Sequence, residues 1–240
     1  MADFQGVFKR SEIKYLVDEE RFGEFMEEVL RHMNPDDYGR TTICSIYFDT
    51  PQWLLVRRSI EKPVYKEKLR LRTYGVPSED SSAFVELKKK YKGIVYKRRI
   101  KLPYREALDW LCGGEIPENM GQIGEEISWF LDSYEGLQPA AALFYDRTAF
   151  YGIDDPLLRL TADENIRFRC DDLDLTEGDS GVLLTKPGER LVEIKIAGAM
   201  PLWLAELLSR LEIFPKSYSK YGNAFMNIQK NIFEGEKVNV

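Results

Sequence analysis

The residues of this sequence that could do chemistry are lysines and arginines spaced two apart between residues 66 and 101. Because successive side chains of a β-strand point to opposite faces, residues two apart lie on one face of their strand. Three neighbouring strands would bring about nine cations to a face that also carries Glu86: Lys66, Lys68, Arg70, Arg72, Lys88, Lys90, Lys97, Arg99 and Lys101. Such a face either lies in bulk water or lines a cavity for a polyanion.

The elements that carry these residues are three predicted strands at about 65–74, 83–91 and 94–102. Short links join them, and Lys92-Gly93 is typical of a tight hairpin turn, so the strands are expected to pair antiparallel. Residues 171–188 are polar and acidic, and we predict a mobile loop there. Further strands are predicted at 7–17, 41–49, 140–151, 157–162, 165–169 and 190–197. Helices are predicted at 18–34, 52–59, 104–112, 124–134, 201–211 and 218–232.

Two architectures fit the alternating charges. An open antiparallel sheet with a solvated polar face is common. However, a solvated face usually mixes Lys with Glu, whereas these charges are mostly of one sign. The flanking strands add more ionic residues: Glu12, Lys14, Arg147, Arg159, Glu193 and Lys195. A sheet this long can close into a barrel, whose cationic interior a multiply charged anion would stabilise. We therefore predict an α+β fold with a closed antiparallel β-barrel tunnel buttressed by helices.

Length and composition limit the function classes. The 240 residues carry a net charge of −6, which argues against a general nucleic-acid binder. The three cysteines form no close pair, and we expect a cytoplasmic protein. Neither a signal peptide nor the ~20-residue apolar stretch of a transmembrane helix is found. We predict one domain over residues 1–240, with its core at about 7–232.

The remaining residue types favour phosphoryl transfer. The single histidine, His32, excludes His-based triads, and no Walker or dinucleotide-binding loop is present. In phosphoryl transfer a protein mainly positions phosphates and neutralises charge, often with a divalent metal. Glu12, Glu86 and Glu193 are oxygen ligands suited to Mg²⁺ or Mn²⁺, although each could equally pair with a neighbouring cation.

Seven short motifs occur in an order that matches a known family. They are Arg10-Ser-Glu-Ile-Lys-Tyr15, Ile46-Tyr-Phe-Asp49, Lys68-Leu-Arg-Leu-Arg-Thr-Tyr-Gly75, Val85-Glu-Leu-Lys88, Tyr145-Asp-Arg147, Val192-Glu-Ile-Lys195 and Ser219-Lys-Tyr221. Residues 7–232 resemble the VTC domain, the polyphosphate-polymerase domain of the vacuolar transporter chaperone complex. That domain belongs to the CYTH-like triphosphate tunnel metalloenzymes.

The resemblance implies a tunnel in which polyphosphate is built from the terminal phosphate of ATP with a divalent metal, often Mn²⁺. Catalytic roles are predicted for Arg70, Arg72, Lys88, Arg147, Arg159 and Glu193. Binding of the triphosphate or the growing chain is predicted for Lys14, Lys68, Lys97, Arg99, Tyr145, Lys195, Ser219 and Lys220. Glu193 is the best metal ligand, with Glu12 and Glu86 as supports.

Two departures from the relatives bear on function. The wider superfamily opens with Glu-x-Glu-x-Lys, whereas this chain has Arg10 at the first position, as expected of the VTC branch. The chain-sensing and membrane-spanning parts of eukaryotic relatives are missing, so export of a product is not implied. Whether a membrane protein binds this chain stays an open question.

The sequence therefore leaves three alternative functions. The first is a polyphosphate polymerase that uses ATP. The second is an inorganic triphosphatase in the same tunnel, with water as the acceptor. The third is a non-catalytic module that binds polyphosphate or inositol phosphates, in which the glutamates are only ion-pair partners.

Overall fold

The computed structural model describes residues 11–61 and 63–234 of the chain, with side chains up to residue 231. Its strands follow the order β1-β10-β8-β7-β3-β4-β5-β6, with β2 beside β7 and β9 beside β8. The pairings β1–β10, β10–β8, β3–β4, β4–β5 and β5–β6 are all antiparallel. The predicted α+β fold with an antiparallel sheet is confirmed. The path ends at β1 and β6, which the described residues do not pair, so backbone pairing does not close the sheet there.

The chain divides into two compact units. Of the described residues, unit 1 contains 11–41, Asp146–Asn165 and Thr185–Tyr218, and unit 2 contains the rest. The strands β7 and β8 contribute residues to both units. The interpretation of the chain as one domain stays a prediction.

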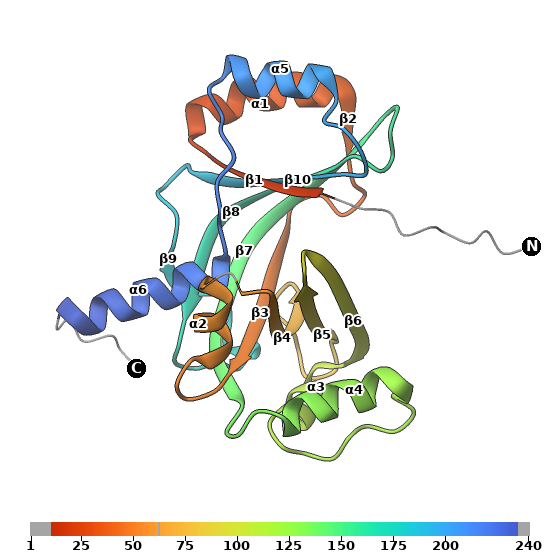
Figure 1. Ribbon diagram of the computed structural model, residues 1–240, viewed down its shortest axis with the longest axis vertical. Helices are drawn as coiled ribbons and strands as arrows, with labels where there is room; N and C mark the ends of the chain where they lie inside the picture. Colours follow the sequence, from red (N-terminus) through yellow and green to blue (C-terminus); the bar gives the residue numbers. More distant parts are fainter. Residues whose placement is uncertain (1–10, 62, 235–240) are drawn as a thin grey trace, which may run out of the picture. The chain divides into compact units, whose positions relative to one another are not determined.

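In unit 1, α1 and α5 lie along one side of the sheet (Figure 1). Asp18 begins α1 as predicted, because its side chain accepts a hydrogen bond from the Arg21 amide at 3.0 Å. The apolar face of α1 buries Phe25 and Val29 against the sheet. The elements of unit 1 are β1 (Ser11–Val17), α1 (Glu19–His32), β2 (Met33–Pro35), β10 (Arg190–Ile196), α5 (Leu202–Arg210) and parts of β7 (Gln138–Gly152) and β8 (Arg159–Arg169).

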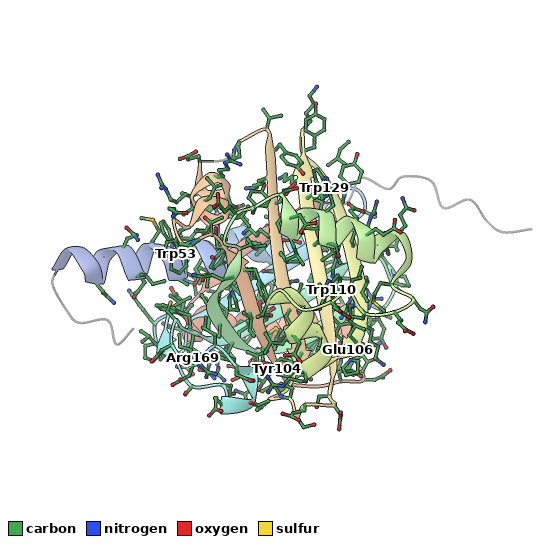
Figure 2. The ribbon with its side chains drawn as sticks, turned by 90° about the horizontal axis from the view of Figure 1, so that it is seen from below. Trp53, Tyr104, Glu106, Trp110, Trp129 and Arg169 are labelled. Atoms are coloured by element: carbon green, nitrogen blue, oxygen red, sulfur yellow. The ribbon has the colours of Figure 1, made fainter. Side chains whose placement is uncertain are left out.

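In unit 2, α3 and α4 lie beneath one face of the β4–β5–β6 strands (Figure 1), and Tyr104 and Trp110 of α3 lie in the core (Figure 2). Leu69 and Leu71 of β4 point into this core and are fully buried. Besides the remaining parts of β7 and β8, the elements are β3 (Thr41–Asp49), α2 (Leu54–Ile60), β4 (Tyr65–Tyr74), β5 (Ser82–Tyr91), β6 (Ile94–Pro103), α3 (Tyr104–Leu111), α4 (Gly121–Asp132), a 3₁₀ helix (Leu175–Glu177), β9 (Val182–Leu183) and α6 (Lys220–Glu234). No helix among the described residues is both long and apolar enough to span a membrane.

One predicted pair of strands is wrong, two short strands were not predicted, and part of the first predicted strand falls outside the described residues. The two strands predicted at 157–162 and 165–169 are the single strand β8, which continues through Asn165 despite that residue's φ of 51°. The strands β2 and β9 are too short to show a sequence pattern. Residues 7–10 of the predicted first strand, including Arg10, lie outside the described residues.

The loop after β8 is held in place rather than mobile as predicted. The Arg169 guanidinium donates hydrogen bonds to four backbone carbonyls of this loop, at 2.8–3.2 Å, those of Asp172, Asp174, Gly178 and Ser180. Leu175 is fully buried in the core of unit 2, and its amide donates to the Tyr104 hydroxyl at 2.7 Å. Composition indicated flexibility, but the Arg169 hydrogen bonds and the long-range contact of Leu175 with Tyr104 order the segment.

Candidate active site

One face of unit 2 carries the predicted array of cations. We define the cationic face as Lys66, Lys68, Arg70, Arg72, Lys88, Lys90, Lys97, Arg99 and Lys101. The strand register aligns them, since Lys68 lies opposite Lys88 and Lys88 lies opposite Lys97. The alternating residues Leu69 and Leu71 point the other way into the core. The predicted common face is therefore confirmed by the register.

Glu86 is the carboxylate around which the cationic face is organised. It is only 2% exposed. Its Oε2 accepts from Arg70 Nε at 2.7 Å and lies 2.6 Å from Arg70 Nη2. Its Oε1 lies 2.5 Å from Lys97 Nζ and 3.4 Å from Arg99 Nε. Burial alone would raise the pKa of Glu86, but the charges of Arg70 and Arg72 and the bond to Lys97 hold it at about 2.

Two tyrosines bind the two central arginines. Arg70 Nη1 donates to the Tyr47 hydroxyl at 3.2 Å, and Arg72 Nη2 donates to the Tyr145 hydroxyl at 2.9 Å. Burial would raise the pKa of Tyr47, but the charges of Arg70, Lys68 and Arg72 lower it to about 7. Both guanidinium groups are therefore fixed in orientation by neighbours on other strands.

The motif Ser219-Lys220-Tyr221 attaches the start of α6 to this face. The Ser219 hydroxyl accepts from Lys68 Nζ at 3.2 Å and from the Gly222 amide at 3.1 Å, so it also caps the helix. Lys220 Nζ lies 4.5 Å from the centre of the Tyr145 ring. Tyr221 stacks on Tyr47 with ring centres 4.5 Å apart. Ser219 and the first two residues of α6 thus contact Lys68, Tyr145 and Tyr47 of the sheet.

Unit 1 carries a second group of ionic residues on one face of its sheet. The register forms two rows: Lys14 lies beside Glu193, and Glu12 lies beside Lys195, which in turn lies beside Arg159. Lys14 Nζ is 3.1 Å from Glu193 and 3.6 Å from Glu12, and it donates to a backbone carbonyl at 3.2 Å. Lys14 therefore pairs with Glu193 and Lys195 with Glu12, the latter at 3.9 Å. Arg159 is exposed and lies beside Lys195, without an ion pair to any described residue.

Arg147 joins this group through a carboxylate that sequence reasoning missed. Asp163 is fully buried and accepts from Arg147 Nε at 2.6 Å and from Nη2 at 2.7 Å. Arg147 Nη2 also lies 3.7 Å from Glu193. This two-point pairing fixes the plane of the guanidinium. Alternation along β8 could have indicated Asp163, because it lies four residues from Arg159 and shares its face.

Known proteins that resemble this chain identify its family. A model of the VTC domain matches residues 9–228, which is most of the chain. This chain belongs to the VTC domain family. No curated protein matches it significantly.

Solved structures similar to this VTC domain include a candidate adenylate cyclase from Bacillus halodurans. It has 16% sequence identity and a TM-score of 0.54, and the match covers 87% of this chain and 92% of the other. A candidate adenylyl cyclase from Hippeastrum, described as having a dominant triphosphatase activity, matches at 14% identity over 88% and 92% of the two chains, with a TM-score of 0.47. The first likeness supports the predicted CYTH-like fold.

The carboxylates of this VTC domain differ in how well they suit a metal. Both oxygens of Glu86 contact cations, so its contacts favour the ion-pair interpretation. Glu12 and Glu193 contact the same lysine, Lys14. Mg²⁺ and similar ions often bind one or two carboxylates and complete their shell with water and phosphate oxygens. Glu12 and Glu193 fit such a site, although no three His, Cys, Asp or Glu of the described residues gather into one.

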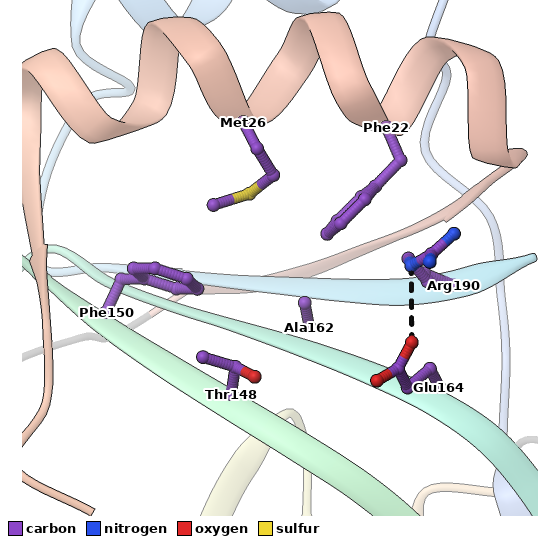
Figure 3. A pocket seen from close by; sticks show the side chains of 7 residues that line it. All are labelled: Phe22, Met26, Thr148, Phe150, Ala162, Glu164 and Arg190. Atoms are coloured by element: carbon purple, nitrogen blue, oxygen red, sulfur yellow. Dashed lines mark ion pairs between the residues drawn. The ribbon is translucent and has the colours of Figure 1, made fainter. Parts of the chain in front are cut away.

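A cavity of about 260 Å³ in unit 1 lies apart from these ionic residues (Figure 3). Phe22 and Met26 of α1 form one wall, and Ala162 and Phe150 belong to the sheet wall. Its ionic residues include Arg190, which lies 3.5 Å from Glu164 and is thus already paired. Ala162 and Glu164 of β8 line the cavity and flank Asp163 in the sequence. The cavity therefore lies on the face of the strand opposite to that of Asp163. Its apolar walls do not suit a phosphate chain.

Proposed function

We propose that this VTC domain is a metal-dependent phosphotransferase that transfers the γ-phosphate of ATP to the end of a polyphosphate chain. The observation that carries the proposal is the cationic face of unit 2, organised around the buried Glu86. Membership of the VTC family supports an activity on polyphosphate or triphosphate. The chemistry of the face agrees, because closely spaced Lys and Arg need a polyanion to offset their mutual repulsion.

Arg70 and Arg72 are the central phosphate ligands in this proposal. A guanidinium presents its donors as a planar fork that suits two phosphate oxygens at once. Tyr47 and Tyr145 already hold the two forks in place, so little reorganisation is needed when phosphate arrives. Lys88, from the neighbouring strand, adds a point charge.

The reaction needs no protein nucleophile. An oxygen of the terminal phosphate of the chain forms the new bond to the γ-phosphorus of ATP, while the bond to the β–γ bridging oxygen breaks and ADP leaves. Catalysis then consists of holding the reacting groups in line and neutralising charge on the transferring group. The cationic face supplies both functions.

Taken by itself, the ionic group of unit 1 is a candidate metal and phosphate site in this proposal. Glu12 and Glu193 would hold Mn²⁺ or Mg²⁺ in place of their contacts with Lys14. When bound, such an ion neutralises phosphate oxygens and helps to orient them. Arg147, fixed by Asp163, would remain as a phosphate ligand beside Glu193.

The test is to incubate the purified protein with ATP and Mn²⁺, or with tripolyphosphate and Mn²⁺, and to separate the products by chain length. We expect a ladder of lengthening polyphosphate from ATP. Arg70→Ala and Glu193→Ala should abolish the ladder without unfolding the protein, whereas Glu28→Ala, which removes a carboxylate of α1, should retain it.

Other outcomes identify other functions. Free phosphate from tripolyphosphate without chain growth would identify a triphosphatase. Metal-independent binding of polyphosphate without turnover would identify a binding module. Full synthesis by both Arg70→Ala and Glu193→Ala would remove the proposed mechanism.

A further inference from the structure

The end of the β5–β6 hairpin carries an unusual amount of exposed apolar surface. We define the tip patch as Tyr65, Tyr91, Ile94, Tyr96 and Trp129. Ile94 is 55% exposed and Trp129 is 65% exposed, and the three tyrosines are nearly half exposed. Large exposed apolar clusters on soluble domains commonly mark interaction sites. The tip patch is therefore a candidate binding surface.

The residues of the tip patch form one continuous surface. Tyr65 lies opposite Tyr91, which lies opposite Ile94, so these three form a row across the three strands. Tyr96 lies on the same face in the next row, opposite Lys89. Lys89 Nζ in turn lies 5.8 Å from the centre of the Trp129 ring. Figure 2 shows Trp129 on α4, close to these strands.

The hairpin turn next to the tip patch is basic. Lys90 and Lys92, at the turn, form no ion pair with any residue that the structure describes. Of the nearby carboxylates, Glu126 is already paired with Lys89 and with Arg98, each at 2.8–2.9 Å. The second, Glu67, is buried and accepts a hydrogen bond from the Tyr134 hydroxyl at 3.2 Å. Glu125, one helical turn before Trp129 on α4, is an exposed carboxylate, so the positive charge lies at the hairpin turn and not all around the patch.

This local charge differs in sign from the rest of the chain. Residues 65–101 contain twelve Lys and Arg against four Asp and Glu, a net charge of +8. Because the whole chain carries −6, the remainder carries −14. Most of these cations lie on the cationic face, opposite the tip patch, so the charge next to the patch itself is that of the basic turn.

A second copy of the chain is a poorer occupant. At the end of the strand path, β6 could pair with another strand, but it carries Lys97, Arg98, Arg99 and Lys101. Two β6 strands paired antiparallel would bring these like charges together across the interface, which is destabilising. Charged edge strands of this kind resist self-association.

We propose that the tip patch docks on an anionic lipid surface. Tyr and Trp suit the headgroup region because each combines an apolar ring with a polar group, and Ile94 supplies apolar area at the turn. Lys92 at the turn attracts anionic headgroups, and Lys90, on the opposite face, adds positive charge at the same end of the hairpin. The docking goes beyond the proposed function and does not depend on it.

The test is co-sedimentation of the full chain with vesicles of phosphatidylcholine mixed with phosphatidylglycerol, and with vesicles of phosphatidylcholine alone. We expect binding only to the anionic vesicles, with binding lost at high salt. Lys92→Ala should weaken the partitioning by about fivefold, the effect of one lysine near an anionic membrane. Ile94→Glu with Tyr96→Ser should abolish it.

Leu202→Glu is the matched control, because Leu202 is 73% exposed but lies on α5 of unit 1. It should bind the vesicles like the wild type, and Ile94→Glu with Tyr96→Ser should still synthesise polyphosphate if the wild type does. Three results would overturn the docking: no binding to anionic vesicles, equal loss in the Leu202 control, or a dimer that the tip variants dissociate while vesicle binding is unchanged.

Discussion

At the scale of single residues, the candidate site keeps its arginines bound before any phosphate arrives. Arg70 contacts Glu86 and Tyr47, and Arg72 contacts Tyr145. These partners neutralise and orient the guanidinium groups in the absence of phosphate. An incoming polyanion therefore competes with ligands of the protein itself, which makes the protonation states of Glu86 and Tyr47 relevant to binding.

We predict that Glu86→Gln lowers the free energy of unfolding by about 3 kcal/mol at neutral pH. The pKa of Glu86 is about 2 in the folded protein against an ordinary value of 4.5. Because the folded-state pKa is the lower one, its stabilisation is complete above about pH 4.5 and is lost as the pH falls towards 2. Urea unfolding of the wild type and of Glu86→Gln across this pH range measures the difference in their free energies of unfolding. A difference that stays constant down to about pH 2 would contradict the assignment.

A second prediction concerns Tyr47. One tyrosine should ionise near pH 7, seen as a step in phenolate absorbance well below the other tyrosines. The charges that face it come from Lys68, Arg70 and Arg72, while Tyr221 stacks on it. Tyr47→Phe should remove the step, and Tyr96→Phe should leave it in place. Because a bound polyanion opposes the phenolate, tripolyphosphate should reverse the ionisation and take up a proton above that pH. Absence of any early step would refute this prediction.

Residue types and spacing predicted the cationic face, and the family resemblance predicted Tyr145, but neither predicted Tyr47 or Asp163. Spacing of two along a strand is enough to place Arg70 and Arg72 on one face. Tyr47 and Asp163 depend on which strand lies beside which, and that register is a long-range property. Tyr47 belongs to a strand that was predicted correctly, whereas Asp163 lies between the two strands predicted in place of β8. The missing information was therefore the pairing for Tyr47, and the continuity of the strand as well as its pairing for Asp163.

At the scale of elements, turn chemistry was predictable and loop order was not. The turn at Lys92-Gly93 has positive φ at both residues, 47° and 86°, as the tight hairpin turn requires. The segment after β8 looked mobile from its polar composition. Its order comes from Arg169, which a local pattern does not reveal because the bonds go to backbone carbonyls.

We predict that Arg169→Met increases proteolysis within residues 172–181 at least several-fold while the strands stay protected. Met keeps the apolar stem, but the loop carbonyls lose their shared donor. Limited proteolysis followed by mass analysis of the fragments locates the cleavage. Arg210→Met, at an exposed helix end, is the control. Unchanged cleavage in the Arg169 variant would show that buried Leu175 holds the loop alone.

At the scale of the whole molecule, an acidic chain carries a local site for a polyanion. Residues 65–101 hold a net +8 within a chain of −6. The α+β fold and the antiparallel sheet were predictable from alternation and from the family resemblance. Closure of the sheet was also predicted, but β1 and β6 do not pair among the described residues.

The measurement that tests the central claim most directly is tripolyphosphate binding to two double variants, by calorimetry without metal. Lys88→Ala with Arg99→Ala removes two charges from the cationic face. Lys89→Ala with Arg98→Ala removes two charges from adjacent positions on the opposite face, where both residues pair with Glu126. We predict that the first variant weakens binding at least tenfold, since each charged hydrogen bond contributes about 1.5–3 kcal/mol, and that the second stays within about twofold of the wild type. Equal loss in both variants would contradict the account, because binding would then follow net charge rather than the cationic face.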